Sequence, residues 1–441
     1  SAPATPAAVP AQSPDERQGL TPYRLAVELL NPGNRKIESA RAAGITTALV
    51  APRRGIFVGQ SALVNLSGGD LGRMIVKTPL AFHISLTGGG RFGAGYPSAP
   101  MGVFAFVKQT LLDTQHYSLA WDIYNANPGA PRPEYSRALE ALQPVYKLQT
   151  PVVLSGDNPT EITRAIDFAD AFRLRLILSG AAEARDVASL LAQRKIPVLL
   201  SVKFPERERD ADPEAKEELD DLRRRVEAPA NAAALAKAGV KFAFQSGDTA
   251  NPRDFIRNVG RAVEAGLDRD VALRALTLTA AEILGVADRF GSIERNKTAN
   301  LVLATGDLFN SATRVKFVFV DGRRFEITEA ETPPAGAPRE SAGSAAGTWT
   351  LNVETPQGPI TATLTLQQSG TGVTGTIQSS MGTAEILEGR LAGNQLTFRV
   401  SAGGMEVSFS AAIQGSTMTG TVTAGAMGTM NFTGSRSPRE Q

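Results

Sequence analysis

The chain has 441 residues, of which 42% are hydrophobic and 20% are charged, and its formal net charge is +2. A net charge this close to zero gives no positive electrostatic potential for binding nucleic acid. The length predicts two or three domains. The chain has no cysteine, which excludes disulfides, thiolate nucleophiles and cysteine-bound zinc. No run approaches the roughly 20 apolar residues of a membrane-spanning helix, so we expect no such span.

Residues 1–19 are rich in alanine and proline and lack apolar periodicity. This composition predicts either a disordered linker or the start of a mature, processed chain. We expect a secreted or periplasmic protein.

Short apolar runs alternate with helical patterns between residues 20 and 290. The runs are Ile45–Pro52, Pro151–Gly156, Leu174–Gly180, Ile196–Val202 and Val240–Gly247. Near-continuous apolar strands that alternate with helices predict a parallel sheet covered on both faces. The repeated unit favours an α/β fold of the TIM-like (β/α) barrel type over a doubly wound sheet.

The last part of the chain differs sharply in composition. Residues 328–346 form a Pro/Ala/Gly/Ser linker, and residues 347–436 contain about eight alternating segments separated by turn signals. This pattern predicts an all-β meander closed into a barrel, with Trp349 and Phe398 inside, and a small β-sandwich is the alternative.

The stretch Ala272–Phe309 contains a helical pattern followed by GSIERNKTANLV. It resembles the closing signature of the amidohydrolase superfamily, especially of imidazolonepropionase-related and other exported members. The resemblance implies that residues 20–290 form the barrel and that residues 291–327 supply strands of a small β-sandwich. Because Ala40–Gly68 resembles the second barrel unit of the family, we expect the barrel to be incomplete at its first strand.

The resemblance also implies metal-dependent hydrolysis of C–N bonds in amides and cyclic imides, but the ligand motifs are missing. The chain has no His-x-His pair and only two histidines, His83 and His116. Ser155 stands where members often carry histidine, and Ala181 and Ala182 stand near another such place. A hydrolytic zinc site needs about three protein ligands and an open position. We therefore expect no metal site and no cofactor in this chain alone, and zinc only if a partner chain supplies the N-terminal half.

Asp248 follows an apolar strand, at a position where barrel enzymes place catalytic groups. It is the candidate catalytic residue, displaced by one from the family aspartate, whose place Gly247 takes. The simpler interpretation is a cap for the following helix. His83, Gln60 and Ser155 are candidates for substrate binding, although His83 is also consistent with a half-buried structural histidine and Gln60 with a simple loop position.

Two helical patterns carry no catalytic signal. Leu112, His116 and Leu119 share one helix face, and Tyr117, Trp121 and Tyr124 share another, which predicts core or interface packing. The mixed charges of Glu206–Glu227 predict a solvated helix, with a docking surface as the alternative.

Three functions therefore remain open. The chain is either an amidohydrolase-like protein that is inactive alone or needs a partner chain, or an active hydrolase with a reduced site around Asp248. The third hypothesis is a binding or scaffold protein whose C-terminal β-domain binds a ligand or partner. The segment Leu20–Leu30 has helical rather than alternating spacing. We do not expect it to fill the missing strand, so association with a partner or a second copy is predicted.

Overall fold

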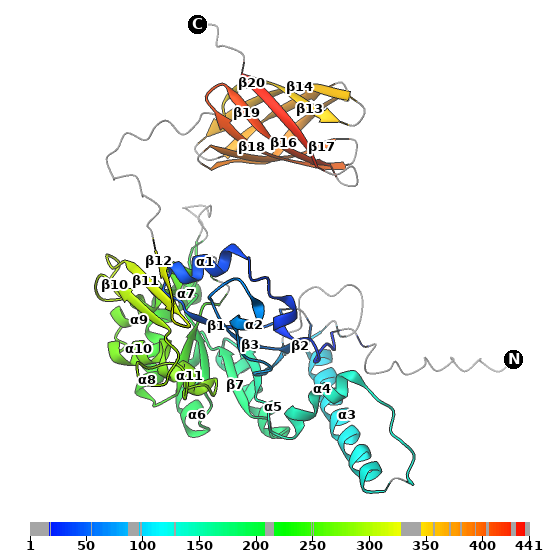
Figure 1. Cartoon of the computed structure of the whole chain (residues 1–441), viewed down its shortest axis with the longest axis vertical. Helices are drawn as coiled ribbons and strands as arrows, with labels where there is room; N and C mark the ends of the chain where they lie inside the picture. Colours follow the sequence, from blue (N-terminus) through cyan, green and yellow to red (C-terminus); the bar gives the residue numbers. More distant parts are fainter. Residues whose placement is uncertain are drawn as a thin grey trace, which may run out of the picture. The chain divides into compact units, whose positions relative to one another are not determined.

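The computed structural model describes most of the chain, in two compact units that comprise residues 1–328 and 329–441. The described residues are 17, 19–53, 55–86, 97, 99–127, 129–207, 216–247, 249, 251–327, 345–355, 358–369, 372–379, 382–392, 394–402, 405–424 and 429–436. Asp248 and nearly all of the predicted segments 1–19 and 328–346 lie outside them. Figure 1 shows the elements of both units, each of which is considered by itself. Within the described part, no helix combines the length and apolarity needed to cross a membrane.

The first unit is built on a six-stranded sheet in the order β2-β5-β6-β7-β8-β9. Its strands are β2 (Phe57–Gln60), β5 (Phe82–Ile84), β6 (Val152–Gly156), β7 (Leu176–Gly180), β8 (Val198–Ser201) and β9 (Phe242–Gln245). Strands β5 to β9 run parallel, and β2 lies antiparallel to β5. The predicted parallel α/β sheet is therefore confirmed. The described residues form an open sheet with edges at β2 and β9 and do not close it into a TIM-like barrel.

Helices and short 3₁₀ turns connect and cover these strands. They are η2 (Ala26–Leu29), α1 (Arg35–Ala42), α2 (Leu71–Met74), α3 (Pro100–Ala126), α4 (Arg137–Tyr146), α5 (Pro159–Ala171), η3 (Ala184–Val187), α6 (Ala188–Gln193), α7 (Leu219–Glu227), η4 (Ala228–Ala230), α8 (Asn231–Lys237), α9 (Pro252–Glu264), α10 (Arg269–Leu276) and α11 (Leu278–Ile283). Several begin at an Asn, Asp or Ser whose side chain accepts a hydrogen bond from the first turn, such as Asn158 at α5 and Asp268 at α10.

Both faces of the parallel strands are buried, as their continuous apolar sequences predict. Alternate residues such as Leu154 and Leu178 join a core that includes residues of α3, α4, α5, α8 and α9. The residues between them, including Val153 and Ile177, pack on the opposite face against Leu63 of β3 and residues around α11. The sheet is thus the middle layer of the unit.

The segment that precedes β2 does not form the predicted helix over its whole length. Leu20 and Leu25 make isolated parallel bridges to Phe57 and Gln60, and a turn closed by the hydrogen bond from the Arg24 N–H to the Thr21 carbonyl lies between them. The chain therefore touches β2 at two points before the short turn η2. Gly59 permits this approach, because a Cβ at its position would lie 2.5 Å from the Arg24 carbonyl oxygen. This edge of the sheet is therefore covered in part by the chain's own N-terminal segment.

Two small sheets flank the parallel sheet, and Asn300 connects them. They contain β1 (Thr47–Val50), β3 (Ala62–Asn65) and β4 (Ile75–Lys77), and β10 (Leu301–Ala304), β11 (Val315–Val320) and β12 (Arg323–Glu326). The Asn300 Nδ2 atom donates to Thr47 Oγ1 at 2.7 Å and to Asn65 Oδ1 at 2.8 Å, and its Oδ1 accepts from the Asp321 N–H at 2.7 Å. The predicted hairpin at Asp321-Gly322 is confirmed, with positive φ at both residues.

The second unit is a closed antiparallel barrel whose eight strands pair in sequence order, with β13 and β20 closing the ring. The strands are β13 (Gly347–Thr355), β14 (Gly358–Ser369), β15 (Gly372–Ser379), β16 (Gly382–Ala392), β17 (Gln395–Ala402), β18 (Met405–Gln414), β19 (Thr417–Ala424) and β20 (Thr429–Arg436). Trp349 and Phe398 are buried in its apolar interior, as predicted. The closed meander is therefore confirmed, and the sandwich alternative is wrong.

Trp349 is the largest buried side chain of the barrel. Its Nε1 atom donates to the Ala345 carbonyl oxygen at 2.9 Å, and the Arg436 guanidinium lies 4.4 Å from the centre of its ring. It therefore links the start of the first strand to the end of the last.

We predict that a fragment of residues 345–441 folds alone and that Trp349→Ala lowers its free energy of unfolding by about 3–5 kcal/mol, because the substitution leaves a large cavity. Urea denaturation followed by far-UV circular dichroism measures this. Thr363→Ala, at an exposed position of β14, is the matched control. Absence of a cooperative transition in the unsubstituted fragment contradicts the prediction.

Candidate functional site at the carboxyl end of the parallel sheet

The carboxyl ends of the parallel strands carry a row of polar side chains on one face. In register, Ser155 of β6 lies beside Ser179 of β7, and Ser201 of β8 lies beside Gln245 of β9. Along each strand these residues are two positions beyond the apolar residues of the same face, such as Val153 and Ala243. The face therefore changes from apolar to polar where the strands end.

Gln245 connects three strands of this row. Its Nε2 atom donates to Ser179 Oγ at 3.1 Å and to the Leu199 carbonyl oxygen at 3.1 Å, so the side chain reaches across β8 to β7. Ser155 is exposed, and its hydroxyl is thus available to a molecule at this edge. The row offers hydroxyl and amide groups, which both donate and accept hydrogen bonds.

His83 of β5 lies on the same face but deeper, beside Val153 in the apolar layer. Its neighbours Phe82 and Ile84 point to the opposite core, which confirms the predicted alternation. The Nε2 atom is buried and has no hydrogen-bond partner among the described residues. Burial lowers the pKa of the imidazole from 6.5 to about 4, so His83 is neutral at neutral pH.

The other predicted site residues are not all brought together. Gln60 is buried at the edge of the sheet, where its Nε2 atom donates to the Pro22 carbonyl oxygen at 2.9 Å and holds the N-terminal segment. Asp248 lies outside the described residues, and its catalytic role stays a prediction. Gly247 has φ +53°, and a Cβ at this position would lie 2.5 Å from Ser201 Oγ. A larger residue at position 247 would therefore displace the Ser201 hydroxyl and adopt a backbone conformation that favours glycine.

Two buried asparagines fix the loops that follow the strands. Asn231 of α8 donates to the Ala181 carbonyl oxygen at 2.8 Å and accepts from the Arg185 N–H at 2.8 Å. Asn258 of α9 donates to the Val202 carbonyl oxygen at 2.8 Å. Both ends of the Asn231 amide have partners, whereas the buried Oδ1 atom of Asn258 has none among the described residues. Asn231 is therefore the more strongly held of these two side chains.

Asp157 follows β6 and faces the loop after β7. The Glu183 N–H donates to the Asp157 carbonyl oxygen at 2.8 Å, and the Asp157 N–H donates to Glu161 Oε2 at 3.0 Å. Partial desolvation is the main cause that raises the pKa of the Asp157 carboxyl, and the charge of Glu161 adds to it, while an N–H of Ala182 opposes both. Sequence analysis missed this carboxylate, although it follows an apolar strand just as Asp248 does.

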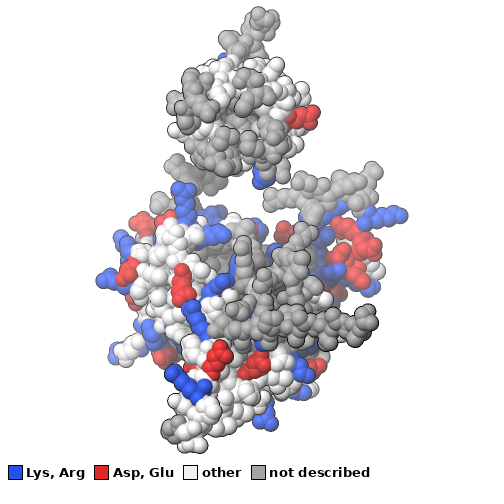
Figure 2. Space-filling view, turned by 90° about the vertical axis from the view of Figure 1, so that its right-hand side faces the viewer, with Lys and Arg blue, Asp and Glu red and all other residues white. Residues whose placement is uncertain are grey.

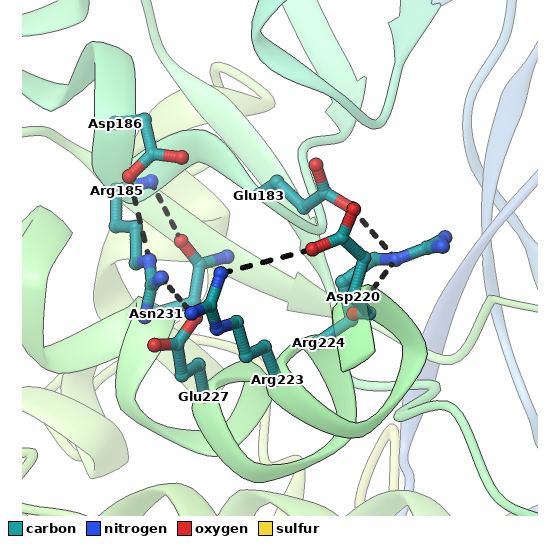
Figure 3. A network of polar contacts seen from close by, with 8 residues as sticks. All are labelled: Glu183, Arg185, Asp186, Asp220, Arg223, Arg224, Glu227 and Asn231. Atoms are coloured by element: carbon teal, nitrogen blue, oxygen red, sulfur yellow. Dashed lines mark hydrogen bonds and ion pairs between the residues drawn. The ribbon is translucent and has the colours of Figure 1, made fainter. Parts of the chain in front are cut away.

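A hollow of about 430 Å³ opens beside these loops. Its lining residues come from the loops after β6 and β7 and from the segment of α7, η4 and α8, and they are Asn158, Ala182, Glu183, Arg185, Asp186, Asp220, Arg223, Arg224, Glu227, Ala228 and Asn231. Figure 3 shows the polar network within it, in which Arg185 contacts Asp186 and Glu227 while Arg223 points toward Asp220.

The hollow carries both signs of charge close together. Arg224 is held by an ion pair with Asp221 at 2.5 Å and lies 3.9 Å from Glu183, whereas Arg223 lies 3.8 Å from Asp220, a distance that leaves its guanidinium group able to contact another anion. Helix α7 has no buried residue, which confirms a solvated helix for the part of the predicted run from Leu219 to Glu227, and one side of it lines this hollow. Residues 208–215 of that run lie outside the described residues. Such a lining suits a small molecule that has both anionic and hydrogen-bonding groups.

The carboxyl edge does not fit a hydrolytic metal centre. The family positions suggested by resemblance hold Ser155, Ala181 and Ala182, none of which supplies an imidazole or carboxylate. Among the described residues, no group of three or more His, Cys, Asp or Glu side chains is arranged to hold a metal ion. We therefore derive no chemical step through a metal.

Comparison with known proteins agrees with the signature found at residues 272–309. Residues 177–325 match the model of the Amidohydrolase family. The structure is similar to an amidohydrolase from Thermotoga maritima MSB8, with 25% identity and a TM-score of 0.60 over 70% of this chain and 79% of that one. These matches show that the α/β unit is similar to proteins of the amidohydrolase superfamily and support the resemblance found in the sequence.

Other similarities are more distant. A prolidase with a bound N-methylphosphonate-L-proline matches with 19% identity and a TM-score of 0.34, over 44% of this chain and 50% of that one. A fatty acid binding protein from Schistosoma mansoni matches with 17% identity and a TM-score of 0.18, over 22% of this chain and 99% of that one. No curated protein sequence gives a significant match.

Replacing Asn231 by Ala removes both hydrogen bonds that hold the loop after β7. We expect the free energy of unfolding of the chain to fall by about 1–3 kcal/mol, because the Ala181 carbonyl and the Arg185 N–H lose their buried partner. Chemical denaturation monitored by circular dichroism tests this. Asn125→Ala, at an exposed position of α3, is the control, and an equal loss in both variants contradicts the assignment.

His83 should make stability depend on pH. Because its pKa is about 6.5 when unfolded and about 4 when folded, the unfolded chain binds the proton first as the pH falls. The free energy of unfolding that His83 contributes above pH 6.5 is lost as the pH falls from about 6.5 to 4. Between pH 7 and pH 5 this loss is about 2 kcal/mol.

Urea denaturation of dilute protein at pH 7 and pH 5 measures this difference. We expect His83→Gln to show a pH dependence smaller by about that amount, whereas Asn125→Ala, at an exposed position of α3, retains the original one. An unchanged pH dependence in His83→Gln contradicts the inferred burial of a neutral imidazole.

Proposed function

We propose that this chain binds a small compound with amide or imide groups at the carboxyl edge of its six-stranded sheet, and that it does not hydrolyse that compound without metal ligands from elsewhere. The family match supports a hydrolase-like origin for the site. The observation that carries the proposal is the polar row Ser155, Ser179, Ser201 and Gln245 at the end of an otherwise apolar face.

This row has the chemistry of amide recognition. A serine hydroxyl and a glutamine amide can each donate to the carbonyl of a ligand and accept from its N–H. Hydrogen-bonding groups at the edge of an apolar surface fix the orientation of a bound ligand. The apolar surface itself removes water from the ligand. Such groups do not lower the pKa of a water molecule in the way that zinc does.

The mixed charges of the hollow at the loops after β6 and β7 narrow the ligand class, although none of the four row residues lines this hollow. Arg223 suits a carboxylate, and Glu183 and Asp220 limit the hollow to ligands that also present donors. N-acyl amino acids combine an amide with a carboxylate and are the compounds that we expect to bind. Asp157, with its raised pKa, is the described carboxyl group placed to exchange a proton at this edge.

Binding can be tested by calorimetric titration with N-acetyl amino acids and with succinimide. We expect Arg223→Ala to weaken binding of the carboxylate compounds by about tenfold, which is the effect of losing one charge-assisted hydrogen bond, and to leave succinimide unaffected. Arg73→Ala, at an exposed position of α2, is the control. Absence of binding for every compound contradicts the proposal.

Metal content gives an independent test. We predict that the full chain, incubated with zinc and then dialysed, retains much less than one zinc ion per molecule, because the carboxyl edge offers hydroxyl and amide groups where histidines would be needed. Elemental analysis measures the metal, and mass spectrometry follows hydrolysis of the same compounds. One tightly held zinc per chain, together with turnover, would restore the interpretation as an active hydrolase.

A further inference from the structure

Helix α3 has two apolar faces, of which the described residues cover one. Its buried face, which includes Phe106, Val107 and Leu111, packs into the core of the α/β unit. On the other face, Leu112, Leu119 and Ile123 are 43%, 50% and 63% exposed. Figure 1 shows helix α3 projecting from the unit. In Figure 2, the lowest part of this unit carries few charged residues on the face that is shown. A surface helix normally presents polar residues on its outer face.

The exposed apolar residues form a continuous stripe. Leu112, His116, Leu119 and Ile123 follow the spacing i, i+4, i+7 and i+11, so they lie in one line along the helix. The line is about 16 Å long at 1.5 Å per residue. Exposed apolar patches with polar borders mark interaction surfaces.

The borders of the stripe are self-complementary. Lys108 and Asp122 are exposed and form no ion pair within the described part of the chain, and they lie seven residues on either side of Gln115. At about 100° per residue the two lie about 40° apart, on the same flank of the stripe. Leu112 and Leu119 are likewise placed symmetrically about the midpoint between Gln115 and His116.

We propose that α3 pairs with α3 of a second copy of this chain, antiparallel and about a twofold axis near Gln115. In this arrangement equal flanks of the two helices meet, so Lys108 of each copy approaches Asp122 of the other, and Leu112 packs on Leu119. A parallel pair would instead bring opposite flanks together, so Lys108 and Asp122, which share one flank, would not meet across it.

The chain's own N-terminal segment suits the stripe less well. Residues 1–16 are SAPATPAAVPAQSPDE, in which Val9 is the only large apolar residue, so the segment cannot fill a line of leucine and isoleucine contacts. A contact between two helices over about four turns is smaller than a standard interface of about 1,600 Å². We therefore expect reversible dimerisation in the micromolar range of concentration.

The absence of cysteine from the chain allows a clean cross-linking test. Full-length Gln115→Cys should form a disulfide-linked dimer under mild oxidation. Lys108→Cys alone and Asp122→Cys alone should form no disulfide-linked dimer, because identical positions lie roughly 21 Å apart along the antiparallel pair. A mixture of the two variants should cross-link, because position 108 of one copy approaches position 122 of the other. Asn125→Cys, on the far side of the helix, is the control and should not cross-link.

Charge reversal separates this pairing from non-specific adhesion. Sedimentation equilibrium should show that Lys108→Asp weakens dimerisation at least threefold and that the double variant Lys108→Asp with Asp122→Lys restores it. Leu119→Glu should weaken it at least tenfold while leaving the circular dichroism spectrum and melting temperature of the monomer unchanged, because the position is exposed.

Three results would overturn the proposal. The first is efficient cross-linking of Lys108→Cys to itself, which indicates a parallel pair. The second is a chain that stays monomeric at several hundred micromolar, and the third is dimerisation that appears only after residues 1–16 are removed, which indicates that this segment covers the stripe.

Discussion

The organisation of the α/β unit depends on the burial of both faces of its parallel strands. Because residues such as Leu154 and Val153 point into two different cores, neither face can hold polar chemistry along most of its length. Polar side chains are accommodated only where the strands end and the loops begin. The row of Ser155, Ser179, Ser201 and Gln245 and the charged hollow beside it occupy this edge, and the helices that cover the sheet position it through Asn231 and Asn258.

The site lies on a scaffold similar to that of amidohydrolases, while its chemistry differs from that of a metal centre. Backbone positions at the strand ends are set by the sheet, whatever side chains they carry. Ser155, Ala181 and Ala182 give this edge hydroxyl and methyl groups rather than imidazole or carboxylate groups. The neutral His83 fits this view, because its ring lies in the apolar layer, where a charged imidazole would be costly.

The periphery is held together by a few polar groups rather than by large cores. Asn300, within the family signature, joins both small sheets through three hydrogen bonds, which gives that signature a structural reason. Helix α3 shows the opposite case, because its outer face remains apolar where nothing among the described residues covers it. The second unit needs no such connections, since a closed barrel pairs all of its strands and buries its own interior around Trp349.

The sequence by itself determined the local elements and the resemblance to a superfamily. Apolar runs predicted the strands β6 to β9, and the alternation of apolar and polar residues predicted the eight strands of the barrel. The stretch GSIERNKTANLV indicated the resemblance to amidohydrolases. Only the tertiary structure decided which side chains meet, since hydrogen bonds such as that from Gln245 to Ser179 join residues 66 positions apart, a separation at which local periodicity carries no information. It also decided that the segment from Leu20 to Leu25 runs beside β2, because pairing with an exposed strand edge outweighs a helical spacing that is only a weak local preference.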